Sequence, residues 1–170
     1  MKKFAILFLL LFSVPVFSQL GMATNFGKWR VGGGLGVSFG DNNYFGLSVY
    51  PNIGYMIAPQ LEGGVTAGYQ YSSWKDVKSN LFSFGPYMNF YPINELFLRG
   101  HYEYFTGNSK IKGQSGSNSY DEDALWLGGG YRSGGKVSFY AGAMYNVLWK
   151  KDESIFSNGL RPIVGVSVGF

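Results

Sequence analysis

The only histidine of this sequence, His101, stands two positions before a glutamate, Glu103. In an extended strand, residues two positions apart point to the same face. A histidine beside a carboxylate can act as a general base in proton transfer. Catalytic sets of this kind carry a serine as well, and the residue between the two is Tyr102. The sequence therefore shows an incomplete catalytic set.

A paired network of charges is the simpler interpretation of the same face. Buried charges persist in proteins when they are paired. We therefore expect a network inside the fold that joins Glu62, Arg99, His101 and Glu103. The full set of charged side chains predicted for the interior is Arg30, Glu62, Arg99, His101, Glu103, Arg132 and Arg161.

The remaining motifs point to weaker chemistry. The glycine runs 32–36 and 128–130 lack the strand-loop-helix setting of a phosphate-binding loop. The acidic run Asp121, Glu122 and Asp123 could hold a divalent cation, but solvated loop charges are the commoner explanation. The same explanation covers the lysines that could meet phosphates, which are Lys110, Lys112, Lys150 and Lys151. Cysteine is absent, which excludes disulfides and cysteine metal sites, and we predict no metal and no cofactor.

The elements that position these residues are predicted to be β-strands. From Trp29 to Phe39, apolar residues alternate with glycine and polar residues, a period of two that is typical of strands. The pattern never settles into a helical period. It predicts eight strands, at residues 29–39, 44–57, 61–72, 80–91, 96–105, 124–132, 136–149 and 160–170.

The lengths of the connections predict how these strands are joined. The links after the second, fourth and sixth strands are short, and those after the third, fifth and seventh are longer and polar. The longest predicted loop covers residues 106–123. This alternation is typical of an up-and-down barrel with its tight turns at one end. Pro51, Pro86 and Pro162 fall within the predicted strands, where we expect bulges or rim positions because proline cannot donate to a ladder.

Composition indicates which face of the barrel meets lipid. Charged residues make up 14% of the chain, against about 25% in soluble domains. An arginine turned toward hydrocarbon costs roughly 2–4 kcal/mol near the membrane midplane, so the charged face must point inward. The apolar face ends in two expected aromatic girdles, formed by Trp29, Tyr55, Phe90 and Tyr131 at the turn end and by Phe39, Tyr71, Tyr104 and Trp149 at the loop end.

The first residues of the chain are typical of a secretory signal. Lys2 and Lys3 precede the apolar run 4–12, and small residues favour cleavage between Ser18 and Gln19. We therefore expect a signal peptide at residues 1–18, export through Sec, and a single barrel domain at residues 19–170. The net charge of +4 is too small to indicate binding to nucleic acid.

These features resemble a known family. The glycine-alternating first strand, the signal ending at Ser18 and the closing segment before Phe170 resemble the OmpA/OmpX-type eight-stranded outer-membrane barrels of Gram-negative bacteria, which include porin-like proteins, and especially small barrel proteins of Bacteroidota. The resemblance implies an outer-membrane location in contact with lipid and lipopolysaccharide, and we expect a monomer. It also implies that the barrel-assembly machinery reads the C-terminal signal, which would comprise Val164, Val166, Val168 and Phe170.

Three functions remain open at this level. The first is a structural or surface-interaction barrel with a plugged lumen and an unidentified extracellular ligand, and the second is a narrow passive channel. The third is a lipid-modifying enzyme, because outer-membrane deacylases and palmitoyltransferases use a histidine and a carboxylate on similar barrels. We favour the first and predict that the protein is not an enzyme, because no complete catalytic or metal set is present.

Overall fold

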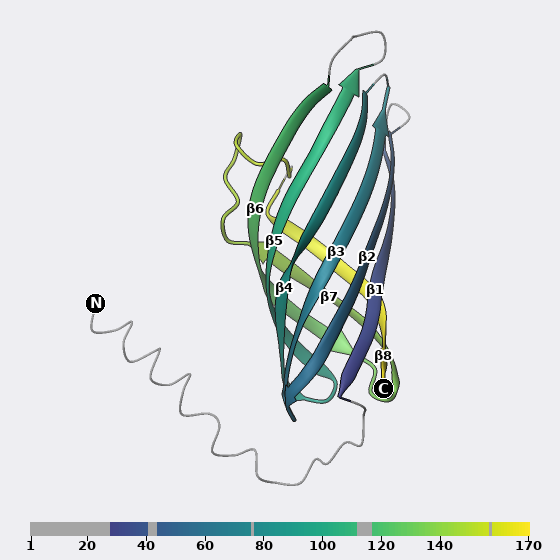
Figure 1. Ribbon diagram of the computed structural model, residues 1–170, viewed down its shortest axis with the longest axis vertical. Coiled ribbons are helices and arrows are strands. Elements are labelled where there is room, and N and C mark those ends of the chain that lie inside the picture. Colours follow the sequence, from purple (N-terminus) through teal and green to yellow (C-terminus); the bar gives the residue numbers. More distant parts are fainter. Residues whose placement is uncertain (1–27, 41–43, 76, 112–116, 157) are drawn as a thin grey trace, which may run out of the picture.

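The computed structural model describes residues 28–40, 44–75, 77–111, 117–156 and 158–170. Eight strands cover most of these residues and tilt around a common axis (Figure 1). They are β1 (Trp29–Gly40), β2 (Tyr44–Ala58), β3 (Leu61–Trp74), β4 (Val77–Ile93), β5 (Leu96–Ile111), β6 (Ser117–Arg132), β7 (Val137–Asn146) and β8 (Leu160–Gly169). The predicted signal peptide lies outside the described residues.

The strands form a closed antiparallel barrel in the order of the sequence, from β1 to β8. The predicted eight-stranded up-and-down barrel is therefore confirmed. Within the described ranges, no helix has the length and apolar character needed to cross a bilayer. Closure matters because strands in hydrocarbon must pair every backbone donor with a neighbouring strand.

Side chains alternate strictly between the two sides of the wall. Along β4, every second residue from Leu81 to Tyr91 is buried and the residues between them are exposed. The exposed set is apolar, and includes Leu35 at 74% and Phe84 at 64%. Because the exposed positions carry the aliphatic and aromatic residues, the outer wall presents an apolar surface of the kind that acyl chains cover.

The predicted loop at residues 106–123 is wrong. β5 continues to Ile111 and β6 starts at Ser117, so most of these residues form a strand hairpin. Side-chain pairs across the hairpin support it, since the Thr106 hydroxyl donates to Asp121 at 3.2 Å. Cross-strand pairs of this kind stabilise strands whose composition alone favours loops.

The heights of the strands differ around the barrel. β4, β5 and β6 contain 17, 16 and 16 residues, whereas β7 and β8 contain 10 each. In Figure 1, β4, β5 and β6 rise well above the connection between β7 and β8. The seventh strand was predicted to reach Trp149, but it ends at Asn146. The Asn146 side chain accepts hydrogen bonds from the Leu125 and Leu148 backbone N–H groups, which turns the chain out of the ladder.

The connection that follows β7 folds back toward the mouth of the barrel. Glu122 of β6 accepts a hydrogen bond from the Ser154 hydroxyl at 2.6 Å and another from the Ile155 backbone N–H at 2.5 Å. The Trp149 indole donates to the Phe156 carbonyl at 3.0 Å. The connection is therefore held against β6 and against itself.

Bulges and rim positions were expected at the prolines, and this is wrong for two of them. Pro51 and Pro86 lie inside β2 and β4. The β2–β3 ladder skips Tyr50 and Pro51, and the β4–β5 ladder skips Gly85 and Pro86, with the same register on both sides of each gap. Each proline lacks a backbone N–H, and the sheet accommodates it by leaving two residues unpaired in one of the two neighbouring ladders.

β1 and β8 close the barrel along only part of their length. Their shared ladder ends at Gly33 opposite Val166. Toward the loop end, residues 34–40 of β1 pair only with β2, and residues 160–165 of β8 pair only with β7. We call this stretch the open seam. Pro162 lies in it, at a place where β8 has no partner on that side to receive a hydrogen bond.

Candidate functional site

The polar side chains of the lumen form two clusters at different heights. The turn-side cluster consists of Arg30, Glu62, Tyr87, Tyr91 and Arg132. The loop-side cluster consists of Thr66, Ser83, His101, Glu103 and Arg161. The interior positions of successive strands supply these residues because alternate residues of a barrel strand point inward.

Glu62 is the centre of the turn-side cluster. The Tyr87 hydroxyl donates to its carboxylate at 2.6 Å, and the Tyr91 hydroxyl donates to the other oxygen. The Arg30 Nε lies 3.6 Å from the same carboxylate, and both side chains are about 95% buried. The Arg132 guanidinium lies 4.7 Å from the centre of the Tyr91 ring. Glu62 thus has partners on both of its oxygens, whereas the buried Nε of Arg132 has no hydrogen-bond partner among the described residues.

Glycine makes room for the turn-side cluster. A Cβ atom at Gly54 would collide with the Glu62 carboxylate and the Tyr87 hydroxyl, and one at Gly64 would collide with the Tyr87 ring. The cavity that remains among these side chains has a volume of about 20 Å³. One water molecule needs about 10–15 Å³ on the same measure, so this level of the lumen has room for little more than one water.

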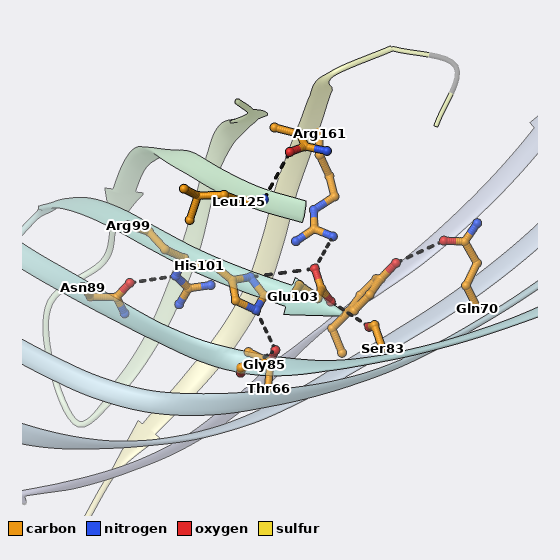
Figure 2. A network of polar contacts seen from close by, with 12 residues as sticks. Thr66, Gln70, Ser83, Gly85, Asn89, Arg99, His101, Glu103, Leu125 and Arg161 are labelled. Atoms are coloured by element: carbon orange, nitrogen blue, oxygen red, sulfur yellow. Dashed lines mark hydrogen bonds and ion pairs between the residues drawn. The ribbon is translucent and has the colours of Figure 1, made fainter. Parts of the chain in front are cut away.

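Glu103 is the centre of the loop-side cluster and is completely buried. Figure 2 shows its carboxylate between Arg161, which donates at 2.8 Å, and Ser83, which donates at 2.7 Å. His101 Nδ1 lies 3.9 Å from the same carboxylate, which is too far for a hydrogen bond. His101 Nε2 lies 2.8 Å from the Thr66 hydroxyl.

This arrangement contains part of a nucleophile-base pair. Thr66 and His101 have the distance expected of a hydroxyl nucleophile and its base. The third link is missing, because the Glu103 carboxylate is engaged by Ser83 and Arg161 and does not orient His101. The sequence analysis missed Thr66 and Ser83, although both lie on the interior face of their strands.

Arg99 lies between the two clusters and pairs with neither carboxylate in the described residues. Its Nε donates to the Asn89 side chain at 2.7 Å, and its guanidinium lies 4.6 Å from the centre of the Tyr87 ring. The expected single network of Glu62, Arg99, His101 and Glu103 is therefore divided into two. Across both clusters and Arg99, four guanidinium groups accompany two carboxylates.

The lumen also contains an apolar cluster that the sequence analysis missed. Its residues lie on the inner wall near the mouth, and they are Leu81, Phe105, Ala124, Trp126 and Met144, with Phe156 and Ile163 packed against them. The Phe156 ring meets the rings of Phe105 and Trp126 edge-on, at 5.0 and 5.3 Å between centres. The signal in the sequence is a local loss of alternation, as in Leu125, Trp126 and Leu127, where both faces are apolar.

A cavity of about 470 Å³ lies between the loop-side cluster and this apolar cluster. Thr66, Arg99, His101 and Arg161 line it on the polar side, and Trp126, Met144 and Phe156 line it on the apolar side. Leu35, Leu160 and Val164 line it as well. These three belong to the stretches of β1 and β8 that form the open seam, so the cavity lies beside the seam.

The predicted girdle residues lie at both ends of the outer wall. Trp29, Phe90 and Tyr131 are exposed, and Tyr55, Tyr71, Tyr104 and Trp149 are partly exposed. Trp29 and Tyr55 pack edge-on across β1 and β2. The side chain of Phe39 lies outside the described residues.

The predicted assembly signal lies on the outer face of β8. Val164 and Val166 are exposed there at 65% and 37%, and Val168 is partly exposed. Phe170 follows the strand and exchanges two backbone hydrogen bonds with Trp29. This segment thus carries both the outer apolar stripe and the final contact of barrel closure.

The remaining sequence motifs do not form a site. Asp121 and Asp123 point outward and Glu122 points to the mouth, because neighbours in a strand face opposite sides. Among the described residues, no group of three or more histidine, cysteine or acidic side chains could hold a metal ion. Lys150 pairs with Glu153 at the surface, and Lys112 lies outside the described residues.

The closed barrel with an apolar wall and a polar interior defines the class of this fold, which is that of the small outer-membrane β-barrels. The chain is similar to the N-terminal β-barrel domain of Pseudomonas aeruginosa OprF, with 15% identity, a TM-score of 0.51, and coverage of 85% of this chain and 99% of that chain. It is also similar to Neisserial surface protein A, with 17% identity, a TM-score of 0.49, and coverage of 84% and 95%. No family model and no curated protein sequence matches the chain. The expected resemblance to eight-stranded outer-membrane barrels is thus confirmed at the level of the fold.

Proposed function

We propose that this protein is an integral outer-membrane barrel with a closed lumen and a structural or surface-interaction role. The turn-side cluster carries the proposal. Its five buried side chains occupy the cross-section of the barrel and leave about 20 Å³. The projecting ends of β5 and β6 supply the surface that an extracellular ligand would meet, in place of the loop expected there.

Planar-bilayer recording tests the closed lumen. The purified barrel is expected to show no steady conductance above the bare membrane. A double variant, Tyr87→Ala with Tyr91→Ala, removes two of the rings that fill the turn-side level and should admit ions. Steady conductance in the unmodified protein would instead support the narrow channel.

We further propose export through Sec, cleavage between Ser18 and Gln19, and insertion by the barrel-assembly machinery as a monomer. The apolar outer face of β8 supports insertion of this kind. Mass spectrometry of the protein isolated from outer membranes gives its N-terminal residue, which should be Gln19. A mature protein that begins at Met1 would contradict the cleavage.

A second candidate function is lipid modification, and the contact between Thr66 and His101 at 2.8 Å is the observation that favours it. Both residues line the large cavity. The test compares lipid A masses from cells that express the protein with those from cells that express His101→Ala. A mass change that depends on His101 would support an enzyme, and identical masses with and without the protein would remove this candidate.

A further inference from the structure

The open seam gives the large cavity an exit through the side of the barrel. Leu35 of β1 and Val164 of β8 are 74% and 65% exposed on the outer wall, yet both also line the cavity. A Cβ atom at Gly34 of β1 would still meet the Val164 carbonyl of β8 at 2.7 Å, whereas one at Gly36 would meet only Ser48 of β2 within 4 Å, so the two strands separate beyond Gly34. The ladder between β1 and β8 ends two pairs before the level of Leu35 and Val164, at Gly33 opposite Val166.

The surroundings of the seam are those of a membrane-embedded surface. Val37 on β1 and Leu160 on β8 flank it with exposed apolar side chains, at 57% and 61%. Val147 and Leu148, just beyond β7, are also exposed and apolar. Because the outer wall on both sides of the seam is apolar, the opening faces acyl chains rather than water.

The polar side of the cavity has an excess of positive charge. Arg161 and Arg99 both line it, and the carboxylate in contact there is Glu103, which pairs with Arg161. Arg99 has no carboxylate partner among the described residues. The Arg161 side chain is 19% exposed although Glu103 is fully buried. Neither guanidinium is fully buried, so both can meet an anionic group bound in the cavity, which would supply the opposite charge that Arg99 lacks.

The middle of the cavity is apolar and has the size of a ligand site. Trp126, Met144 and Phe156 form its wall opposite the polar side. Its volume of about 470 Å³ lies within the range of about 300–1,000 Å³ that small-molecule sites occupy. The cavity thus has Arg99 on β5 at one side, an apolar wall, and the open seam at the other side, where Arg161 lies on β8 and contacts the Trp126 ring, 4.1 Å from its centre.

We propose that this cavity binds a single-chain amphiphile with an anionic head group. The head group lies beside Arg99 and Arg161, and the acyl chain passes Trp126 and Met144 and leaves through the open seam. A fatty acid and a lysophospholipid share this chemistry. None of the five residues of the turn-side cluster lines this cavity, so a failure to bind the amphiphile would leave the proposed closed lumen unaffected.

Native mass spectrometry of the barrel in a neutral maltoside detergent tests the proposal with two probes, palmitate and lysophosphatidylglycerol. One molecule of at least one probe should bind per barrel, and the tighter probe identifies the head group. Uncharged monopalmitin and chainless acetate should bind much more weakly. Equal binding of palmitate and monopalmitin would overturn the role of the charge, and no binding of either anionic probe would overturn the site.

Two arginine variants supply a matched comparison. Arg99→Gln removes the unpaired charge and should weaken binding about 10- to 100-fold, which corresponds to one hydrogen bond to a charged group. Arg132→Gln removes a guanidinium that lines only the turn-side cavity and should leave binding unchanged. The circular dichroism spectrum without probe should be the same for Arg99→Gln as for the unmodified barrel, so that weaker binding is not caused by misfolding. Equal binding by the two variants would contradict the assigned head-group position.

A staple across the seam tests the path of the chain. Because the protein has no cysteine, the double variant Leu35→Cys with Val164→Cys contains a single possible disulfide. The oxidised form should take up palmitate at least tenfold more slowly than the same protein after reduction. Equal rates in the two forms, with oxidation verified by mass, would show that the chain does not enter through the seam.

Discussion

The two halves of the lumen handle buried charge differently. At the turn-side level, Glu62 accepts hydrogen bonds from Tyr87 and Tyr91 and forms an ion pair with Arg30, and almost no space remains. At the loop-side level, Glu103 is equally buried, but it lies beside a cavity of about 470 Å³ and an incomplete ladder. A buried glutamate is therefore part of a filled level in one half of the barrel and lies near a large cavity in the other.

This difference indicates that the turn-side level stabilises the barrel, whereas the loop-side level has room for a ligand. Buried charges surrounded by partners lose much when one partner is removed. Charges beside a cavity can turn toward water or a ligand, so they lose less. Parts of a protein that bind ligands are commonly drawn from its less stable regions.

The largest expected effect comes from Glu62→Gln. It leaves the Arg30 charge buried at 4% exposure without its carboxylate, which should lower the free energy of unfolding by about 3–5 kcal/mol. Urea unfolding in detergent micelles, followed by tryptophan fluorescence, measures the change. Glu153→Gln is the control, because its pair with Lys150 is 70% exposed and should contribute almost nothing.

The same substitution at the other level, Glu103→Gln, should cost less, about 1–3 kcal/mol. Arg161 then loses its carboxylate but borders the cavity, where water can solvate it. The two glutamine variants are compared in one unfolding experiment. A loss for Glu103→Gln as large as that for Glu62→Gln would break the distinction between the two levels.

A smaller effect is expected from Phe156→Leu at the mouth. It keeps an apolar side chain but removes the edge-on contacts with Phe105 and Trp126, which are worth about 0.5–1.5 kcal/mol. Thermal unfolding of the folded barrel measures it. Phe139→Leu on the outer wall, where Phe139 is 64% exposed, should show no comparable loss.

The smallest effect concerns the seam and needs no substitution. Backbone amides of β1 beyond the shared ladder, at Leu35 and Val37, should exchange with deuterium faster than those of Val31 and Gly33, because the odd-numbered amides of β1 point to β8, as that of Trp29 does. The first pair lacks the β8 ladder and the second has it. Residue-resolved exchange by NMR in micelles measures the difference, and equal protection of the two pairs would show that the seam is closed in solution.

Much of the fold could be predicted because the barrel obeys a local rule. Alternation in segments such as Trp29 to Phe39 identifies both a strand and the side chains that point inward, and the charges indicate which side is inside. Thr106 and Asp121 show the limit of composition, because their residue types favour a loop and yet their partners across the hairpin hold them in strands.

The site was less predictable, since it depends on contacts between distant strands. His101 and Thr66 are 35 positions apart, and no local pattern reports their contact. Arg99 lies on the predicted interior face of its strand, as Arg30 and Arg161 do. The sequence therefore contains no sign that Arg99, unlike those two, lacks a carboxylate partner among the described residues. The seam was hidden for a similar reason, because Val164 and Gly165 continue the alternation of β8 whether or not β1 pairs with them.

Because the strands have unequal lengths, two sides of the barrel differ in height, and the barrel is not symmetric about the membrane normal. β5 is six residues longer than β7, which at about 3.4 Å per residue and a tilt of about 40° makes its side roughly 15 Å taller. At the loop end, the barrel is therefore tall along β4, β5 and β6 and short along β7 and β8. A neighbouring protein packed against the short side, at β7 and β8, would cover the proposed opening at the seam. One packed against the tall side would leave it free. The rotation of each barrel about the membrane normal, relative to its neighbours, would therefore decide whether a lipid can reach the seam.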